Sequence, residues 1–398
     1  MKKLKIGLLP KILIAIVLGI GLGLGLVYLD QIDQTVKDSF VRIFITFNGI
    51  FSQFLGFAIP LIIVGLVTTA IADIGNRAGK MLLVTVLIAY GSTIFAGLVS
   101  YLTGASLFPS MIETGTSLHV AEAEGLAPFF EVNIPPLMGV MTALVLAFTL
   151  GLGLASTQNE TLMKATHGFE EIVVKTIKAV IIPVLPLYIF GIFLNMAYEG
   201  TVFSILSVFI KIIGIIFLIH IGILILQFCI AGAITRKNPF RLLWNMLPAY
   251  FTALGTQSSA ATIPVTLEQT RKNGVSEDIA GFSIPLCATI HMSGSTLKIV
   301  ACALALMIMQ GMPYDFGMFA GFICMLGITM VAAPGVPGGA IMASLGLLSS
   351  MLGFSEDAQG LMIALYIAMD SFGTACNVTG DGAIALIVDR IFRKKSKN

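Results

Sequence analysis

The chain of 398 residues is 57% hydrophobic and only 11% charged, with a formal net charge of +2 and a mean hydropathy of +0.97. Soluble domains carry roughly 25% charged residues, so this composition excludes an ordinary soluble globular protein and indicates a surface that faces lipid. The small net charge gives no reason to expect a nucleic-acid partner.

Eight apolar stretches are long enough to cross the hydrocarbon core of a bilayer, which takes about 20 helical residues. They lie near 11–30, 38–72, 80–104, 134–156, 167–197, 202–235, 277–310 and 357–392. The first follows a basic start and lacks the small-residue cleavage site of a signal peptide, so we expect it to stay as a spanning helix. The sequence therefore predicts an all-α membrane protein with eight transmembrane helices.

Two further apolar stretches, near 243–270 and 316–352, are interrupted at their midpoints, by residues 256–264 and 332–340. Both interruptions contain proline, which breaks the backbone hydrogen-bond ladder, and freed backbone groups persist at membrane depth only where they face protein or water. We therefore expect two re-entrant helical hairpins, with a pair of proline-kinked spanning helices as the alternative. Two such segments point to a transporter whose site is built from helix ends.

Basic residues fall in alternate loops, and the opposite loops are acidic. The basic positions are Lys2, Lys3, Lys5, Lys11, Arg77, Lys80, Arg236, Lys237, Arg241, Arg271, Lys272 and the run 390–397. Because positive loops stay in the cytoplasm, we expect both termini there. The first hairpin would then enter the membrane from the cytoplasm and the second from outside.

The last apolar stretch carries two carboxylates, Asp370 and Asp381. An ionised aspartate near the bilayer centre costs at least about 2.5–3.5 kcal/mol on insertion scales, so such residues usually face a cation, a substrate or a water-filled cavity. Thr374, Asn377 and Thr379 lie between them and offer oxygen ligands. This chemistry suits a small cation.

Four motifs resemble one family in their order along the chain. They are Ser258-Ser259 with Thr262-Ile-Pro-Val-Thr266, Ala288-Thr-Ile-His-Met-Ser-Gly294, Pro334-Gly-Val-Pro-Gly338 and Asn377-Val-Thr-Gly-Asp381. They are similar to the hairpin and helix signatures of the dicarboxylate/amino acid:cation symporters, the family of the glutamate transporters. The serine/threonine:sodium symporters are nearest, since they share the short second hairpin tip and lack an acidic residue in the seventh helix.

The resemblance implies a homotrimer in a prokaryotic plasma (inner) membrane. Residues 1–235 would be mainly scaffold and trimerisation helices, with the third and sixth helices flanking the transport unit. Residues 240–398 would form that unit from the two hairpins and the seventh and eighth helices. The unit would move against the scaffold in an elevator-type cycle driven by sodium, with the second hairpin as the extracellular gate.

The substrate site that the resemblance implies lies between the hairpin tips and the last helix. Its residues are Ser258, Ser259, Val336, Pro337, Gly338, Asp370, Gly373, Thr374 and Asn377. Asp370 aligns with the carboxylate that holds the substrate's amino group, and Ser259 with the tip amides would hold the α-carboxylate.

Two positions decide the expected substrate. Gly373 and Gln257 stand where acidic-substrate members carry arginine, so no guanidinium remains to pair with an acidic side chain. We therefore expect a small neutral amino acid of the serine, threonine or alanine type. Cystine or an organic acid is the alternative.

The implied cations are sodium ions, two or fewer per protomer. One site would combine Asp381 with carbonyls of Cys287, His291 and Asn377, and another would use carbonyls of Thr289 and Met292 with the second hairpin. In acidic-substrate members a third site uses an aspartate and an asparagine of the seventh helix, where this chain has Ser293 and His291. The nearby Ser92 and Thr93 would remain as a polar patch without an ion.

Two basic side chains in this region each allow two interpretations. Lys298 is expected either to act as a built-in cation near the lost third site or to snorkel toward the outer face. His291 is either a proton carrier, which would make transport proton-coupled, or a neutral hydrogen-bonded residue.

We expect no organic cofactor, and no nucleotide loop or catalytic triad supports an enzyme. A channel would not need a substrate-sized pocket with a lone carboxylate.

Overall fold

The computed structural model describes residues 8–29, 31–76, 80–112, 126–331, 333 and 338–392, which are mainly helical and form no strand. The helices of the first half are α1 (Leu8–Tyr28), α2 (Gln34–Asn76), α3 (Lys80–Leu107) with the 3-10 turn η1 (Phe108–Ser110), α4 (Val140–Thr157), α5 (Glu160–Thr176), the π-helical turn η2 (Ile177–Ile181), α6 (Ile182–Tyr198) and α7 (Val202–Thr235). The helices that follow are α8 (Pro239–Thr256), α9 (Ser259–Lys272), α10 (Glu277–Ile290), α11 (Ser293–Met309), α12 (Phe316–Val331), α13 (Gly339–Leu352), α14 (Glu356–Ala368) and α15 (Asp370–Phe392).

Six helical stretches in the described residues are long and apolar enough to cross a membrane. They are Leu8–Tyr28, Gln34–Asp73, Lys80–Ser110, Glu160–Tyr198, Ile205–Thr235 and Glu277–Met309, and the bent pair α14 and α15 makes a seventh if counted as one span. The remaining predicted span, 134–156, corresponds to the shorter α4. The prediction of an all-helical membrane-type chain is confirmed, and the count of eight spans stays a prediction.

The first predicted interruption separates two helices that double back on one another. Between α8 and α9 the backbone of Gln257 is left-handed, with φ of 53°, and Ser258 caps α9. At the other end of the pair, Asn273 after α9 donates to the Leu242 carbonyl of α8 over 3.0 Å and accepts from Asn245 over 2.8 Å. The tip and the base of this hairpin are therefore both defined by hydrogen bonds.

The second interruption separates α12 from α13, which also pack together. Val336 and Pro337, two of the predicted substrate contacts, lie outside the described residues, whereas Gly338 is described and has a left-handed φ of 76°. A glycine is favoured at this position because other residues rarely adopt that conformation.

Two further breaks were not expected from the sequence. The predicted span 277–310 is divided into α10 and α11 by His291, whose backbone is extended, and Met292. The predicted span 357–392 bends by 61° between α14 and α15, at Met369. Proline and glycine are both missing from these break positions, so the usual local signals for a helix end are not there.

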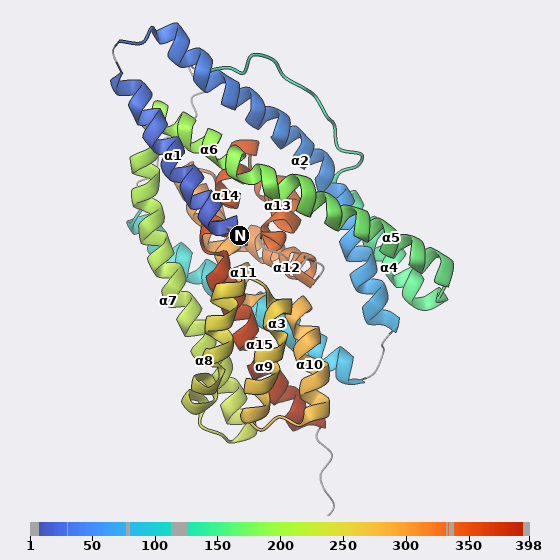
Figure 1. The fold of residues 1–398 in the computed structure, drawn as a ribbon. Helices are drawn as coiled ribbons and strands as arrows, with labels where there is room; N and C mark the ends of the chain where they lie inside the picture. The colour runs from blue at the N-terminus through green and yellow to red at the C-terminus, as the bar shows by residue number, and fades with distance from the viewer. Residues whose placement is uncertain are drawn as a thin grey trace, which may run out of the picture.

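The broken helices occupy the centre of the molecule. Every residue of α11 from Ser293 to Met309 is buried, as are most residues of α15. α11 packs against α3, α7, α14 and α15, and α15 also packs against α8, α9 and α10, which lie around it in the lower half of Figure 1. α1, α2, α4, α5 and α6 form the upper part of the view. Polar groups on α11 and α15 are thus kept away from lipid.

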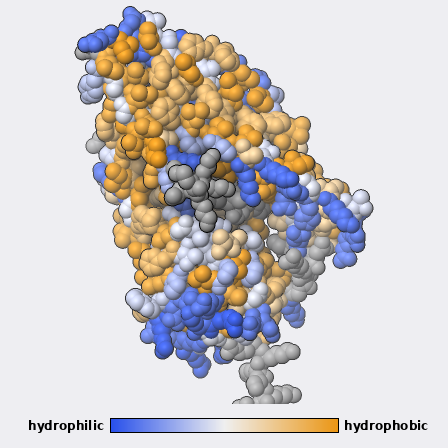
Figure 2. All heavy atoms as spheres, viewed as in Figure 1, coloured by the Kyte–Doolittle hydropathy of each residue, from blue (hydrophilic) through white to orange (hydrophobic). Residues whose placement is uncertain are grey.

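The outer helices present apolar side chains to the surroundings. Large exposed hydrophobic residues include Val17 on α1, Leu83 on α3, and Ile210 and Leu218 on α7. Figure 2 shows hydrophobic residues over much of the visible face, with hydrophilic residues gathered at its lower end and also present at the upper left and along the right side. An apolar belt with a polar end is what a bilayer-embedded protein requires.

Close packing of α1 on α6 depends on two glycines one turn apart. A Cβ atom on Gly19 would lie 2.7 Å from the Phe190 carbonyl oxygen, and one on Gly23 would lie 2.6 Å from the Leu194 carbonyl oxygen. Small residues four apart allow two membrane helices to approach closely, where dispersion and packing hold them together.

We expect Gly23→Ala to destabilise the purified protein by about 1–3 kcal/mol, because the added methyl forces α1 away from α6. Gly21→Ala is the matched control, since no atom lies within 4 Å of a Cβ at that position. Thermal unfolding in detergent micelles measures both. Equal melting temperatures for the two variants would show that this contact does not limit stability.

Candidate functional site

Asp370 and Asp381 lie on the same face of α15. They are eleven residues apart, which in an α-helix is about three turns and roughly 16 Å along the axis. Both are buried, with 5% and 1% of their surfaces exposed. Each carboxylate therefore needs a partner inside the protein, and each has a basic side chain from the α10–α11 segment beside it.

The break between α10 and α11 is held open by side chains from two other helices. The Met292 N–H donates to Thr93 Oγ1 of α3 over 3.3 Å, and the Gly294 N–H donates to Asn377 Oδ1 of α15 over 2.7 Å. These N–H groups have no partner within α11 because Met292 precedes the helix and Gly294 lies in its first turn. Side-chain caps from α3 and α15 thus replace the missing helical hydrogen bonds.

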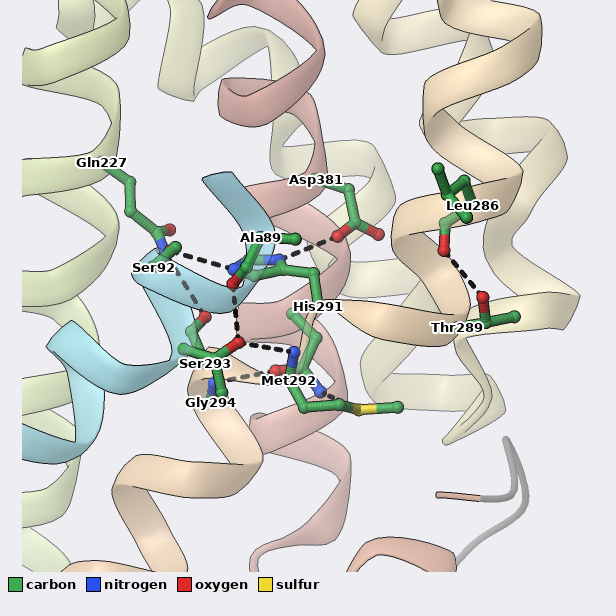
Figure 3. A network of polar contacts seen from close by, with 12 residues as sticks. Ala89, Ser92, Gln227, Leu286, Thr289, His291, Met292, Ser293, Gly294 and Asp381 are labelled. Atoms are coloured by element: carbon green, nitrogen blue, oxygen red, sulfur yellow. Dashed lines mark hydrogen bonds and ion pairs between the residues drawn. The ribbon is translucent and has the colours of Figure 1, made fainter. Parts of the chain in front are cut away.

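Asp381 begins a chain of hydrogen bonds that crosses to α7 (Figure 3). His291 Nδ1 lies 2.9 Å from Asp381 Oδ1, and His291 Nε2 lies 3.1 Å from Ser92 Oγ. Gln227 Nε2 donates to Ser92 Oγ over 2.9 Å and to Ser293 Oγ over 3.3 Å. With a neutral His291, all donors can point in one direction, from Gln227 through Ser92 and His291 to the carboxylate.

Oxygen atoms without a hydrogen-bond partner lie in this region of the described structure. Gln227 Oε1 and Thr379 Oγ1 are both buried and unpaired. No group of three or more His, Cys, Asp or Glu side chains in the described residues could hold a metal ion. A cation here would therefore rely on Asp381 together with carbonyl, amide and hydroxyl oxygens, a donor set that fits a hard monovalent ion.

Asp370 is contacted by the second hairpin and by a lysine. Its Oδ2 accepts the N–H of Gly338 over 2.8 Å, and its Oδ1 lies 3.8 Å from Lys298 Nζ. The same ammonium donates to the Met369 carbonyl over 3.0 Å and lies 3.9 Å from the centre of the Tyr366 ring. Lys298 thus reaches from α11 to the bend between α14 and α15.

A short polar chain connects the two carboxylate regions. Asn377 Nδ2 donates to Ser295 Oγ over 3.2 Å and contacts Met292 Sδ at 3.3 Å. Tyr366 OH donates to Ser295 Oγ over 2.9 Å. Asn377 therefore contacts the α10–α11 break, and through Ser295 it reaches Tyr366, against which Lys298 packs.

The structure brings most of the predicted site residues to this centre. Asp370, Gly373, Thr374, Asn377 and Asp381 share α15, and His291 and Met292 face them across the break. The N–H of His291 bonds to the Cys287 carbonyl over 2.9 Å, so that predicted sodium ligand already accepts one hydrogen bond.

Other predicted residues have local roles. Ser258 Oγ accepts the Ala261 N–H over 3.3 Å as a helix cap, and Ser259 is buried in the first turn of α9. Thr289 is exposed, and its hydroxyl bonds back to the Leu286 carbonyl over 2.7 Å. α9 packs against α15, which brings the first hairpin to the same helix.

Three contributors were missed from the sequence. Gln227 on α7, Ser295 on α11 and Tyr366 on α14 all take part in the polar chains described above. Gln227 is a polar residue in a strongly apolar stretch, so the sequence alone could have marked it as a candidate site residue. Ser295 and Tyr366 carry no such signal, because hydroxyl groups are common in membrane helices.

Broken helices that meet at buried carboxylates inside an apolar belt define a helical membrane protein of the secondary-transporter class. The chain belongs to the sodium:dicarboxylate symporter family, whose model matches residues 8–391. Excitatory amino acid transporter 1 from Rattus norvegicus and that from Mus musculus are each 33% identical to it over 166 residues, which is 42% of this chain. The aligned part covers 30% of each relative.

We expect Gly294→Ala to weaken both stability and transport. A Cβ there would lie 2.5 Å from Cys376 Cβ and 2.5 Å from the Gly373 carbonyl oxygen, so α11 and α15 would have to separate. The cost is about 1–3 kcal/mol for overpacking. Gly281→Ala on α10 is the control, since its Cβ meets nothing within 4 Å. Thermal unfolding and uptake into proteoliposomes measure the two effects, and equal results from both variants would contradict this prediction.

Proposed function

We propose that this protein is a sodium-coupled symporter that carries a small amino acid into the cell. The observation that carries the proposal is the pair of buried carboxylates on one face of α15, one at the second hairpin and one at the break between α10 and α11. The family match supports symport with sodium. A bound cation would offset Asp381, and the substrate's ammonium would pair with Asp370.

The transport cycle that we propose is of the elevator type. The unit of residues 240–398 would carry the site across the membrane against a scaffold of residues 1–235, within a homotrimer in a prokaryotic plasma membrane with both termini cytoplasmic. The near-complete burial of α11 and α15 supports this assignment, because the charged groups travel enclosed in protein. The contact between Gly338 and Asp370 supports a gate at the second hairpin.

The roles of the two carboxylates can be separated by neutral substitutions. Asp370→Asn should reduce amino acid affinity by at least about 30-fold, because it removes the charged partner of a buried ammonium. Asp381→Asn should mainly weaken sodium affinity, by about 10-fold or more. Isothermal calorimetry with sodium and with substrate distinguishes the two effects.

Asp278→Asn is the control for both substitutions, since this aspartate is exposed in the first turn of α10. Equal and mild effects of the two α15 substitutions on both ligands would argue against the assigned roles.

A second candidate is proton coupling, and the buried contact of His291 with Asp381 favours it. A protonated His291 would place a positive charge beside the carboxylate that sodium would otherwise neutralise. In this case an inward proton gradient would drive uptake without sodium, a protonophore would abolish it, and His291→Gln would remove the dependence. Uptake that follows the sodium gradient and survives the protonophore would leave sodium coupling as the function.

A further inference from the structure

A cavity of about 310 Å³ lies between the helices of the first half and the second hairpin. Its walls come from α2, the segment 136–140 and α6 on one side, and from α13, α14 and the turn between them on the other. α13 and α14 lie beside α2 and α6 in the upper half of Figure 1. No described residue of α11 or α15 lines the cavity, so it is separate from the two buried carboxylates. Sites for small molecules occupy roughly 300–1,000 Å³.

The cavity is bounded by close contacts between its two sides. A Cβ atom on Gly346 of α13 would lie 2.7 Å from Ile59 Cγ2 of α2, and one on Gly360 of α14 would lie 2.5 Å from Ile192 Cδ1 of α6. By contrast, a Cβ atom on Gly56 of α2, which lines the cavity, would meet no atom within 4 Å. The open space at Gly56 is therefore local and does not result from loose packing between the two sets of helices.

The lining combines an apolar wall with one carboxylate. Leu55, Met138 and Ile363 are among its many apolar side chains, and Glu356 in the first turn of α14 is the one charged residue. Glu356 Oε1 accepts from Gln53 Nε2 over 2.9 Å, and no basic side chain of the described residues lies within ion-pair distance of this carboxylate. A molecule that matches this lining needs an apolar body and a group that donates charged hydrogen bonds to a carboxylate.

We propose that this cavity binds a small amphipathic amine. The ammonium pairs with Glu356, and the apolar body fills the space beside Gly56. A membrane lipid with two acyl chains is too large to be enclosed by this volume, which favours a small molecule as the occupant.

The bound amine contacts α2 and α6 on one side and α13 and α14 on the other. A ligand that fits only one arrangement of two moving parts stabilises that arrangement. If residues 240–398 move against residues 1–235 as proposed above, the amine therefore slows transport. Binding itself does not depend on that cycle.

Three probes with the same carbon body test the site in the full-length protein in nanodiscs: 4-phenylbutylamine, 4-phenylbutanol and 4-phenylbutyrate. Calorimetry should show the amine binding about 10-fold tighter than the alcohol, with the acid weakest, because only the amine offers a cation to Glu356. Glu356→Gln should abolish this order. Asp357→Asn is the matched control and should keep it, since this neighbouring carboxylate does not line the cavity. Partition of the probes into the nanodisc lipid is common to all these proteins.

A thiol in the cavity locates the bound probe. Gly56→Cys, made together with Cys324→Ser to remove an exposed cysteine, should react with a maleimide, and 4-phenylbutylamine should slow that reaction by about 5-fold or more at saturation. Gly49→Cys is the control, because a Cβ there also meets nothing within 4 Å but the residue lies outside the lining. Its reaction should not respond to the amine.

Equal binding of the three probes, or an unchanged reaction of Gly56→Cys, would overturn the proposed site. Labelling of Gly56→Cys that is already slow in phosphatidylethanolamine nanodiscs, and fast in phosphatidylglycerol ones, would identify a lipid amine as the occupant and overturn the small-molecule assignment. If the amine binds as expected but leaves uptake into proteoliposomes unchanged, its effect on the cycle is wrong while the site stands. Absence of any uptake without the amine would instead count against the proposed function.

Discussion

The structure depends on the need to neutralise charge in a core that excludes water. Asp370 and Asp381 would be costly in a helix surrounded by lipid, and both are enclosed by α11 and its neighbours. Lys298 lies beside the Asp370 carboxylate, and His291 lies beside the Asp381 carboxylate. Both basic residues come from the sequence that ends α10 and begins α11. The charged groups of two central helices thus determine how those helices must pack.

That packing in turn explains where the helices break. An unbroken α10–α11 helix would use the Met292 and Gly294 N–H groups internally, and Thr93 and Asn377 would lose their partners. The bend at Met369 likewise sets Asp370 at the start of α15, where the positive end of the helix dipole favours a carboxylate. The Met369 carbonyl at this bend accepts from Lys298. The first break therefore offers backbone N–H groups to the neutral side chains of Thr93 and Asn377, and the second offers a carbonyl to the charged side chain of Lys298.

The sequence predicted the parts of the fold that depend on local composition. Apolar length located the long helices, and the clusters near Pro264 and Pro334 located the interruptions between α8 and α9 and between α12 and α13, whereas their re-entrant course stays a prediction. The breaks at His291 and Met369 could not be found this way, because the residues that stabilise them lie on α3, α11 and α15, far away in the chain. The carboxylates and the basic residues beside them, His291 and Lys298, were singled out from the sequence, whereas the polar residues that connect them across helices, Gln227, Ser295 and Tyr366, were not.

The position of Lys298 illustrates the limit of comparing sites one sequence position at a time. Gly373 alone indicates a pocket without a cation, and Lys298 alone indicates an unexplained charge in an apolar helix. Only the close approach of α11 to α15, made possible by Gly294, joins the two observations. Asn377 contacts the break beside His291 and also Ser295, which in turn bonds to Tyr366 beneath the Lys298 ammonium. The regions of the two carboxylates are therefore joined by a set of hydrogen-bonded and packed groups that runs through Asn377, Ser295 and Tyr366.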